Sequence, residues 1–247
     1  MRLYELAKSN IQLSLALKQK GINHKSYKFY TSMKNACKFR ENGYIYLSNG
    51  QNWNDIVDRD QMTEKRVYGK CFSYYSKENI AMWMLYGENG GKEGAMIELN
   101  KQHINNILNC ISVDLGSFQG AVGYVASKTL QKGEFEIFFS DIIYTDESKS
   151  NNKYCITLAD DHANVHKKIL NNQDIFCKDY AWSYERETRL IIRPLGKHKN
   201  DPLNSQYSYA RIKIPLENIR IVRSPIYSGK INIGNYSYLN NKVSWDL

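Results

Sequence analysis

Short strand patterns and short helix patterns follow one another in an irregular order along this chain of 247 residues. Strands are predicted by alternation or by Val and aromatic content at 26–31, 44–48, 67–75, 94–99 and 120–126. Helices are predicted by apolar spacing at 3–20, about 32–42, 78–91, 102–111 and 160–172. The last third turns to strands, at 183–193, 207–214, 219–223 and weakly at 230–245. This mixed order predicts the α+β class rather than a doubly wound parallel sheet.

Apolar residues make up 42% of the chain, which is enough to build a substantial core without disulfide staples. No internal repeat occurs, and no stretch rich in Pro, Gly and Ser separates two halves. We therefore predict a single domain over 1–247, in which 1–21 form an added N-terminal helical extension.

The formal net charge is +9, so the summed field of the protein attracts polyanions such as nucleic acid. The five cysteines include no C-x-x-C pair, which is typical of a reducing cytoplasm rather than of a zinc site or a disulfide framework. Polar residues interrupt the first twenty positions, so we expect neither a secretory leader nor a membrane span. These observations predict a cytoplasmic protein.

The common signatures of dinucleotide, phosphate and serine-hydrolase sites do not occur in the chain. His162 and His166 have the spacing of helical metal ligands, close to Asp160 and Asp161. The pair lacks the glutamate of H-E-x-x-H, so we predict no metal. A metal-dependent nuclease that uses Asp160, Asp161 and His162 is the least favoured alternative.

Residues 182–190 read WSYERETRL and set two glutamates two positions apart. In a strand, alternation would place Glu185, Glu187 and Arg189 on one face, with the Cα atoms of the two acids roughly 6.5–7 Å apart. Two carboxylates at that distance can divide the work at a sugar carbon, because one stabilises positive charge while the other orients a nucleophile. Spacing alone, however, favours a solvated ladder in which Arg186 or Arg189 neutralises the acids.

A second cluster of candidate residues lies in CFSYYSKENIAMWMLYG, residues 71–87. Ser73, at a strand end, can hydrogen-bond a ribose or an amide. Trp83 and Tyr86, three apart on a short helix, can stack on a flat ring, although such aromatic residues more often belong to a core. Three further residues, Lys178, Trp182 and Tyr184, are expected to do one of two things. They form a cover over a bound ligand, or they form the edge of the hydrophobic core.

Taken in chain order, these segments resemble the bacterial domain-of-unknown-function family 2971. The segments that carry the resemblance are SYKFYTS (26–32), YLSNGQNWND (46–55), CFS (71–73), MWMLYG (82–87), GAMIEL (94–99), VGYV (122–125) and WSYERETRLI (182–191). The resemblance runs from about 26 to 225, and its last motif is the most specific.

The family in turn looks like the ADP-ribosyltransferase fold. This implies a split, mostly antiparallel β core with peripheral helices, NAD as co-substrate and no resident metal. Through the matching motif, Glu187 is implied as the catalytic glutamate that stabilises positive charge as nicotinamide leaves, and Glu185 as the residue that selects or activates the acceptor. Ser73 corresponds to the serine of the second active-site strand, and Trp83 or Tyr86 is implied to pack near the nicotinamide.

The first core strand of that fold usually gives an Arg or His to NAD, whereas this chain has Phe29 or Tyr30 at the matching position. Tyr30 can bind a ribose or a phosphate through its hydroxyl, but it does not offer the bidentate charged contact of arginine. Because related proteins occur in bacterial toxin and anti-phage systems, the resemblance also implies an antitoxin or defence protein as partner.

Two functions follow as expectations. The first is NAD-dependent transfer of ADP-ribose to a macromolecule, with nucleic acid favoured over protein as acceptor, and with Glu187→Gln abolishing transfer at nearly unchanged thermal stability. The second is a non-catalytic module that binds nucleic acid or a partner protein in a defence complex. The residues of YERE with Ser73 favour the enzyme, and the missing Arg or His favours the module.

Overall fold

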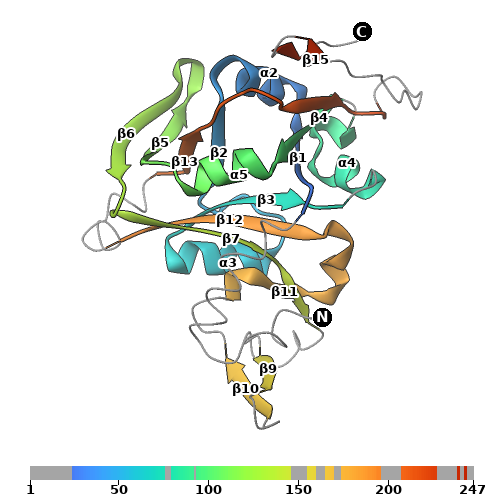
Figure 1. The fold of residues 1–247 in the computed structure, drawn as a ribbon, viewed down its shortest axis with the longest axis vertical. Coiled ribbons are helices and arrows are strands. Elements are labelled where there is room, and N and C mark those ends of the chain that lie inside the picture. The colour runs from blue at the N-terminus through green and yellow to red at the C-terminus, as the bar shows by residue number, and fades with distance from the viewer. Residues whose placement is uncertain are drawn as a thin grey trace. The chain divides into compact units, whose positions relative to one another are not determined.

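The computed structural model describes residues 24–75, 79–91, 93–145, 155–159, 165–169, 174–195, 207–226, 238–239 and 242–243 (Figure 1). They form two compact units, of which the first draws on 46–71 and 111–210 and the second on 24–45, 72–110 and 211–247. Three strands begin in one unit and end in the other: β2 (Tyr44–Ser48), β3 (Tyr68–Ser73) and β13 (Tyr209–Lys213). Pairing is mostly antiparallel, which confirms the predicted α+β class.

The second unit is built on an antiparallel pair, β1 (Ser26–Ser32) with β4 (Gly94–Asn100), whose register sets Tyr30 opposite Met96. Strand β14 (Arg220–Arg223) adds to the other edge of β4, and Lys28 of β1 pairs with Ser73. The unit also contains α2 (Met33–Asn42), α4 (Ile80–Tyr86), η3 (Glu88–Gly91), α5 (Lys101–Leu108), β15 (Tyr238–Leu239) and β16 (Lys242–Val243).

Helix α2 shows why its own predicted boundaries are right. The side chain of Ser32 caps its N-terminus by accepting a hydrogen bond from the backbone N–H of Asn35. Gly43 ends it in the left-handed region at φ 70°, where its N–H reaches the carbonyl of Phe39. Ala36 and Phe39 are buried, as the apolar spacing predicts.

The first unit contains two long antiparallel pairs, β5 (Ser112–Gln119) with β6 (Gly123–Gln131), and β7 (Phe135–Asp141) with β12 (Glu187–Pro194). Strand β12 also pairs with β3, so it lies between two neighbours and is buried along almost its whole length. The shorter elements are α3 (Ile56–Lys65), η4 (Gly120–Val122), β8 (Ile143–Thr145), β9 (Cys155–Ala159), β10 (Val165–Ile169), η5 (Asp174–Phe176), β11 (Cys177–Asp179) and η6 (Tyr180–Glu185).

Predicted elements are wrong in two segments of the first unit before η6. Residues 49–60 were expected to form a loop, but α3 begins at Ile56, because the Asp55 side chain accepts hydrogen bonds from the backbone N–H groups of Val57 and Asp58. The helix expected at 160–172 is contradicted over Val165–Ile169, which is strand β10, because pairing with β9 outweighs a weak helical pattern.

Strands β5 and β7 were not predicted, and the helix predicted at 3–20 lies outside the described residues. The ADP-ribosyltransferase type of the β core and the single-domain assignment stay predictions. Among the residues that the structure describes, no helix is long and apolar enough to cross a membrane.

Candidate functional site

Glu185 and Glu187 lie on two different elements of the first unit. Glu185 ends the 3-10 helix η6, and Glu187 begins strand β12. Arg186 between them takes a left-handed backbone conformation at φ 44°, which breaks the strand alternation. The expected strand over 183–193 is therefore wrong before Glu187, and the two acids do not share a strand face.

Lys178 nevertheless brings the two carboxylates together. Its Nζ lies 2.7 Å from Glu185 Oε2 and 3.4 Å from Glu187 Oε2. Lys178 sits on β11, which pairs in parallel with β8 and sets Lys178 opposite Tyr144. The hydroxyl of Tyr144 accepts a hydrogen bond from the backbone N–H of Glu187 at 2.9 Å. The β8–β11 pair thus fixes both the cation and the start of β12.

Arg189 binds the other oxygen of Glu187 and connects β12 to α3. Its Nε donates to Glu187 Oε1 at 2.7 Å, and its two Nη groups donate to the two oxygens of Asp58, each at 2.9 Å. This fork-to-fork pair is the strong, geometrically specific form of an arginine–carboxylate contact. The guanidinium also lies 4.9 Å from the ring of Trp53. We call Asp58, Lys178, Glu185, Glu187 and Arg189 the charge cluster.

The charge cluster is buried, so it is not a solvated ladder. Glu185 and Glu187 are each 2% exposed, and Arg189 is fully covered. Burial alone would raise the pKa of Glu187, but Arg189 and Lys178 outweigh it and hold this pKa at about 2. The pKa of Lys178 is raised, because Glu187 and Glu185 outweigh the cost of burying its ammonium. Glu187 is therefore ionised at neutral pH.

Two further groups bear on this site. Burial raises the pKa of Asp58 above that of an ordinary aspartate, while the bidentate bond to Arg189 acts in the opposite direction. Burial, with the nearby Glu187 as second cause, raises the pKa of the Cys71 thiol, which hydrogen-bonds Glu187. Cys71 is thus a protonated donor rather than a nucleophile.

Asp58 is the member of the charge cluster that sequence reasoning missed. It lies 131 positions before Arg189, inside a segment that was expected to be a loop. Its only local signal is its position near the start of a capped helix, where an acid is common on any helix. A pattern in one sequence does not show that such an acid turns inward.

Trp182 and Tyr184 lie beside the charge cluster, of which Lys178 is a member. Lys178 is buried and its Nζ lies 4.4 Å from the centre of the Trp182 ring, a cation–π contact. Tyr184 is exposed at the surface, and Trp182 is half-buried. The expectation that these residues form either a cover or a core edge stays open between its two alternatives.

The four residues predicted to bind NAD lie in the second unit. Tyr30 and Trp83 meet edge to face, with centroids 4.9 Å apart, inside an apolar cluster with Met82, Met96 and Val222, and Tyr86 packs against this cluster. Trp83 is fully buried, so the core alternative describes its surroundings.

Ser73 is also buried, and its Oγ accepts a hydrogen bond from the backbone N–H of Tyr75. Of the four residues predicted to bind NAD, Tyr30, Trp83 and Tyr86 thus lie together in the apolar cluster. Glu185 and Glu187, by contrast, belong to the first unit.

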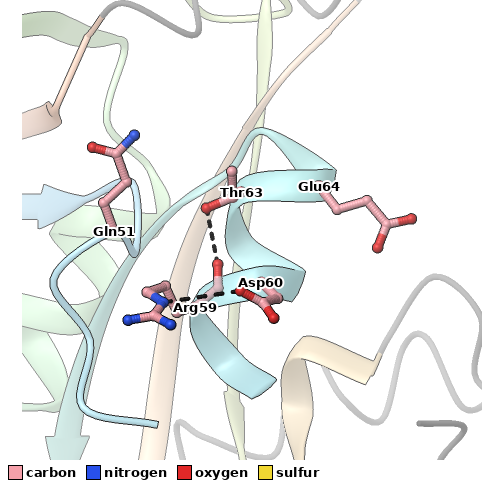
Figure 2. A pocket seen from close by; sticks show the side chains of 5 residues that line it. All are labelled: Gln51, Arg59, Asp60, Thr63 and Glu64. Atoms are coloured by element: carbon pink, nitrogen blue, oxygen red, sulfur yellow. Dashed lines mark hydrogen bonds and ion pairs between the residues drawn. The ribbon is translucent and has the colours of Figure 1, made fainter. Parts of the chain in front are cut away.

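A surface hollow on the first unit lies at the outer side of α3 (Figure 2). It is lined by Gln51, Arg59, Asp60, Thr63 and Glu64. None of the predicted site residues lines it, and Asp58 is buried on the same helix. Among the described residues, no three His, Cys, Asp or Glu side chains group as metal ligands. The residues Asp160, Asp161 and His162 lie outside the described part of the chain.

Residues 82–190 match the family model described as Protein of unknown function (DUF2971). The matched segment begins within α4 and runs as far as Arg189 and Leu190, so it contains both glutamates and supports the resemblance to that family. No match was found among curated proteins or among solved structures.

Proposed function

We propose that the chain is an ADP-ribosyltransferase-like protein that cleaves NAD and transfers ADP-ribose to a macromolecule, with nucleic acid the favoured acceptor and protein the second. The observation that carries the proposal is the convergence of Glu185 and Glu187 on one ammonium, with Glu187 held ionised by its neighbours. A fixed carboxylate in a dry site is what stabilises an oxocarbenium-like transition state.

The residues have separate roles in this proposal. Glu187 stabilises the positive charge that develops on the ribose as nicotinamide departs, and Glu185 orients the acceptor. Since Lys178 and Arg189 occupy the oxygens of Glu187, the ribose gains access only when Lys178 releases its longer 3.4 Å contact. Trp182, over the Lys178 ammonium, is then the side chain that moves with it.

The test is incubation of the purified protein with NAD labelled in its adenylate part, together with DNA, RNA and protein in separate reactions. Label transfer to one acceptor with release of nicotinamide is the expected result. Neither transfer nor nicotinamide release in any reaction would overturn the proposal.

The second candidate is a non-catalytic module that binds nucleic acid or a partner, in a toxin or defence setting. The observation that favours it is the burial of both carboxylates in ion pairs, because such networks also hold folds together without chemistry. Salt-sensitive binding of nucleic acid without any turnover of NAD would identify this module.

A further inference from the structure

Four aromatic side chains of the first unit form a second cluster, which contains no residue of the charge cluster. We call it the aromatic face: Tyr46 on β2, Phe118 on β5, Tyr124 on β6 and Tyr209 on β13. The ring centroid of Phe118 lies 5.3 Å from that of Tyr46, 5.6 Å from that of Tyr124 and 5.1 Å from that of Tyr209. Phe118 is 45% exposed, and the other three are half-buried.

The aromatic face lies on the side of its strands that faces away from the core. The strands are neighbours in the order β2-β13-β5-β6. On β2, Ile45 and Leu47 are buried while Tyr46 between them is half-buried, as strand alternation requires. The rings thus stand on the outer surface of a sheet rather than in a core.

Gly116 leaves room for the hydroxyl end of the Tyr124 side chain against β5. A Cβ at Gly116 would meet the Tyr124 hydroxyl at 2.9 Å and the carbonyl oxygen of Val125 at 2.0 Å. The hydroxyl of Tyr124 donates to the carbonyl of Asp114 at 2.9 Å, which holds its ring in place. The ring of Tyr124, against which Phe118 packs, is therefore held in place before any ligand arrives, which lowers the side-chain entropy that binding of a flat ligand would cost.

Strand β13, which carries Tyr209, also carries positive charge. Strand β13 continues beyond Tyr209 with Arg211 and Lys213 at alternate, outward positions, while Ala210 and Ile212 are buried. Both cations lie over the ring of Tyr44 in the second unit, Arg211 at 4.1 Å and Lys213 at 5.8 Å. Aromatic rings interleaved with cations on a strand surface are what stack bases and attract phosphates.

We propose that the aromatic face binds single-stranded nucleic acid, with a base stacked on Phe118. A duplex hides the faces of its bases, so a stacking surface selects unpaired strands. Sugars or proline-rich peptides also stack on aromatic rings, but they gain nothing from the net charge of +9. This inference rests on the proposed function, in which nucleic acid is the acceptor. It adds that the acceptor is single-stranded and that the aromatic face binds it.

The test is fluorescence anisotropy with a labelled oligo(dT), a labelled oligo(U) and a duplex of equal length, titrated without NAD at low and at physiological salt. Single strands are expected to bind more tightly than the duplex. Phe118→Ala is expected to weaken single-strand binding about fivefold or more. Phe118→Tyr keeps the ring and so keeps binding, and Ile111→Ala, which removes another exposed apolar side chain of the same unit, leaves it unchanged.

Equal binding of duplex and single strand, or wild-type affinity of Phe118→Ala, would overturn the inference, because either result means that charge alone drives binding. Absence of binding to every oligonucleotide would overturn it as well, and would leave a protein as the occupant. A melting temperature for each variant separates a binding defect from loss of the fold. Phe118→Trp gives a second measurement, since a stacked base is expected to quench the new indole.

The two proposals can fail separately. Single-strand binding that depends on Phe118, without NAD cleavage, rejects the transferase and keeps the aromatic face. Transfer of ADP-ribose to single strands at an equal rate by wild type and Phe118→Ala rejects the aromatic face and keeps the transferase.

Discussion

Glu187 contacts both cations of the charge cluster, Arg189 through one oxygen and Lys178 through the other. Removing its charge leaves two buried cations with one fewer counter-charge, which is costly in a medium of low dielectric constant. Because Glu187 is buried in this way, we now expect Glu187→Gln to lower thermal stability rather than to leave it nearly unchanged. Activity and stability of this variant have to be measured together.

Asp58→Asn is predicted to lower the free energy of unfolding by about 3–5 kcal/mol, because it leaves the buried guanidinium of Arg189 without its bidentate partner. Urea denaturation followed by circular dichroism measures this change. Asp60→Asn is the matched control, since Asp60 is an exposed acid on the same helix, and it is expected to change stability by less than about 0.5 kcal/mol.

The double variant Asp58→Leu with Arg189→Met gives the sharper form of the same test. Replacing a buried ion pair by apolar side chains of similar size is often neutral or stabilising. Because Arg189 also binds Glu187, Arg189→Met leaves one oxygen of that buried carboxylate without its partner. We therefore expect the double variant to regain only part of the stability that Asp58→Asn loses. Equal stability of Asp58→Asn and Asp60→Asn would contradict the role given to Asp58.

The pH dependence of stability follows from the low pKa of Glu187. This pKa is about 2 in the folded protein and near 4.5 for an ordinary glutamate, so the unfolded chain takes up the proton first as the pH falls. The stabilisation from ionised Glu187 is thus present above about pH 4.5 and is lost as the pH falls towards 2.

The measurement compares the urea midpoints of wild type and Glu187→Gln at pH 7, 4.5 and 3. Asp58, Glu185 and the two cations are present in both proteins. The difference between the two urea midpoints at each pH, which we call the gap, therefore reports on Glu187. The gap is predicted to be largest at pH 7 and to narrow at pH 3. A gap that stays constant over this range would mean that Glu187 is not held ionised by Lys178 and Arg189.

At the scale of elements, the sequence predicted strands β1, β2 and β4 but did not predict helix α3. Alternation and apolar or aromatic content predicted β1, β2 and β4, because these strands bury one face or both. Helix α3 was missed because its inward side carries Asp58 and Gln61 beside Met62, and so lacks an aliphatic stripe. Its partner is Arg189, and tertiary charge pairing of this kind leaves no periodic signal.

Gly116→Ala is predicted to lower the free energy of unfolding of the first unit by about 1–3 kcal/mol, because the new Cβ would overlap the Val125 carbonyl of the adjacent strand. The pairing register shifts next to Gly116, where β5 and β6 approach closely. Thermal melting measures the loss. Ser127→Ala, at an exposed position on β6, is the control and should melt close to wild type. A Gly116→Ala protein that melts like Ser127→Ala would contradict the close approach.

At the scale of the whole molecule, the sequence predicted the α+β class, but the geometry that it predicted for Glu185 and Glu187 is wrong. Strand spacing was expected to bring Glu185 and Glu187 together, whereas a 3-10 helix, a left-handed Arg186 and the Lys178 ammonium do so. The burial of the pair was also missed, because WSYERETRL contains charges at alternate positions and so looks solvated.

The most direct test of the proposed chemistry is the rate of nicotinamide release from NAD, with single-stranded nucleic acid present, by wild type and by Glu187→Gln at a temperature where both are folded. We predict measurable release by wild type and a rate about 100- to 1,000-fold lower for Glu187→Gln. Asp60→Asn is expected to match wild type. Equal rates for wild type and folded Glu187→Gln, or no release by wild type with any acceptor, would contradict the account.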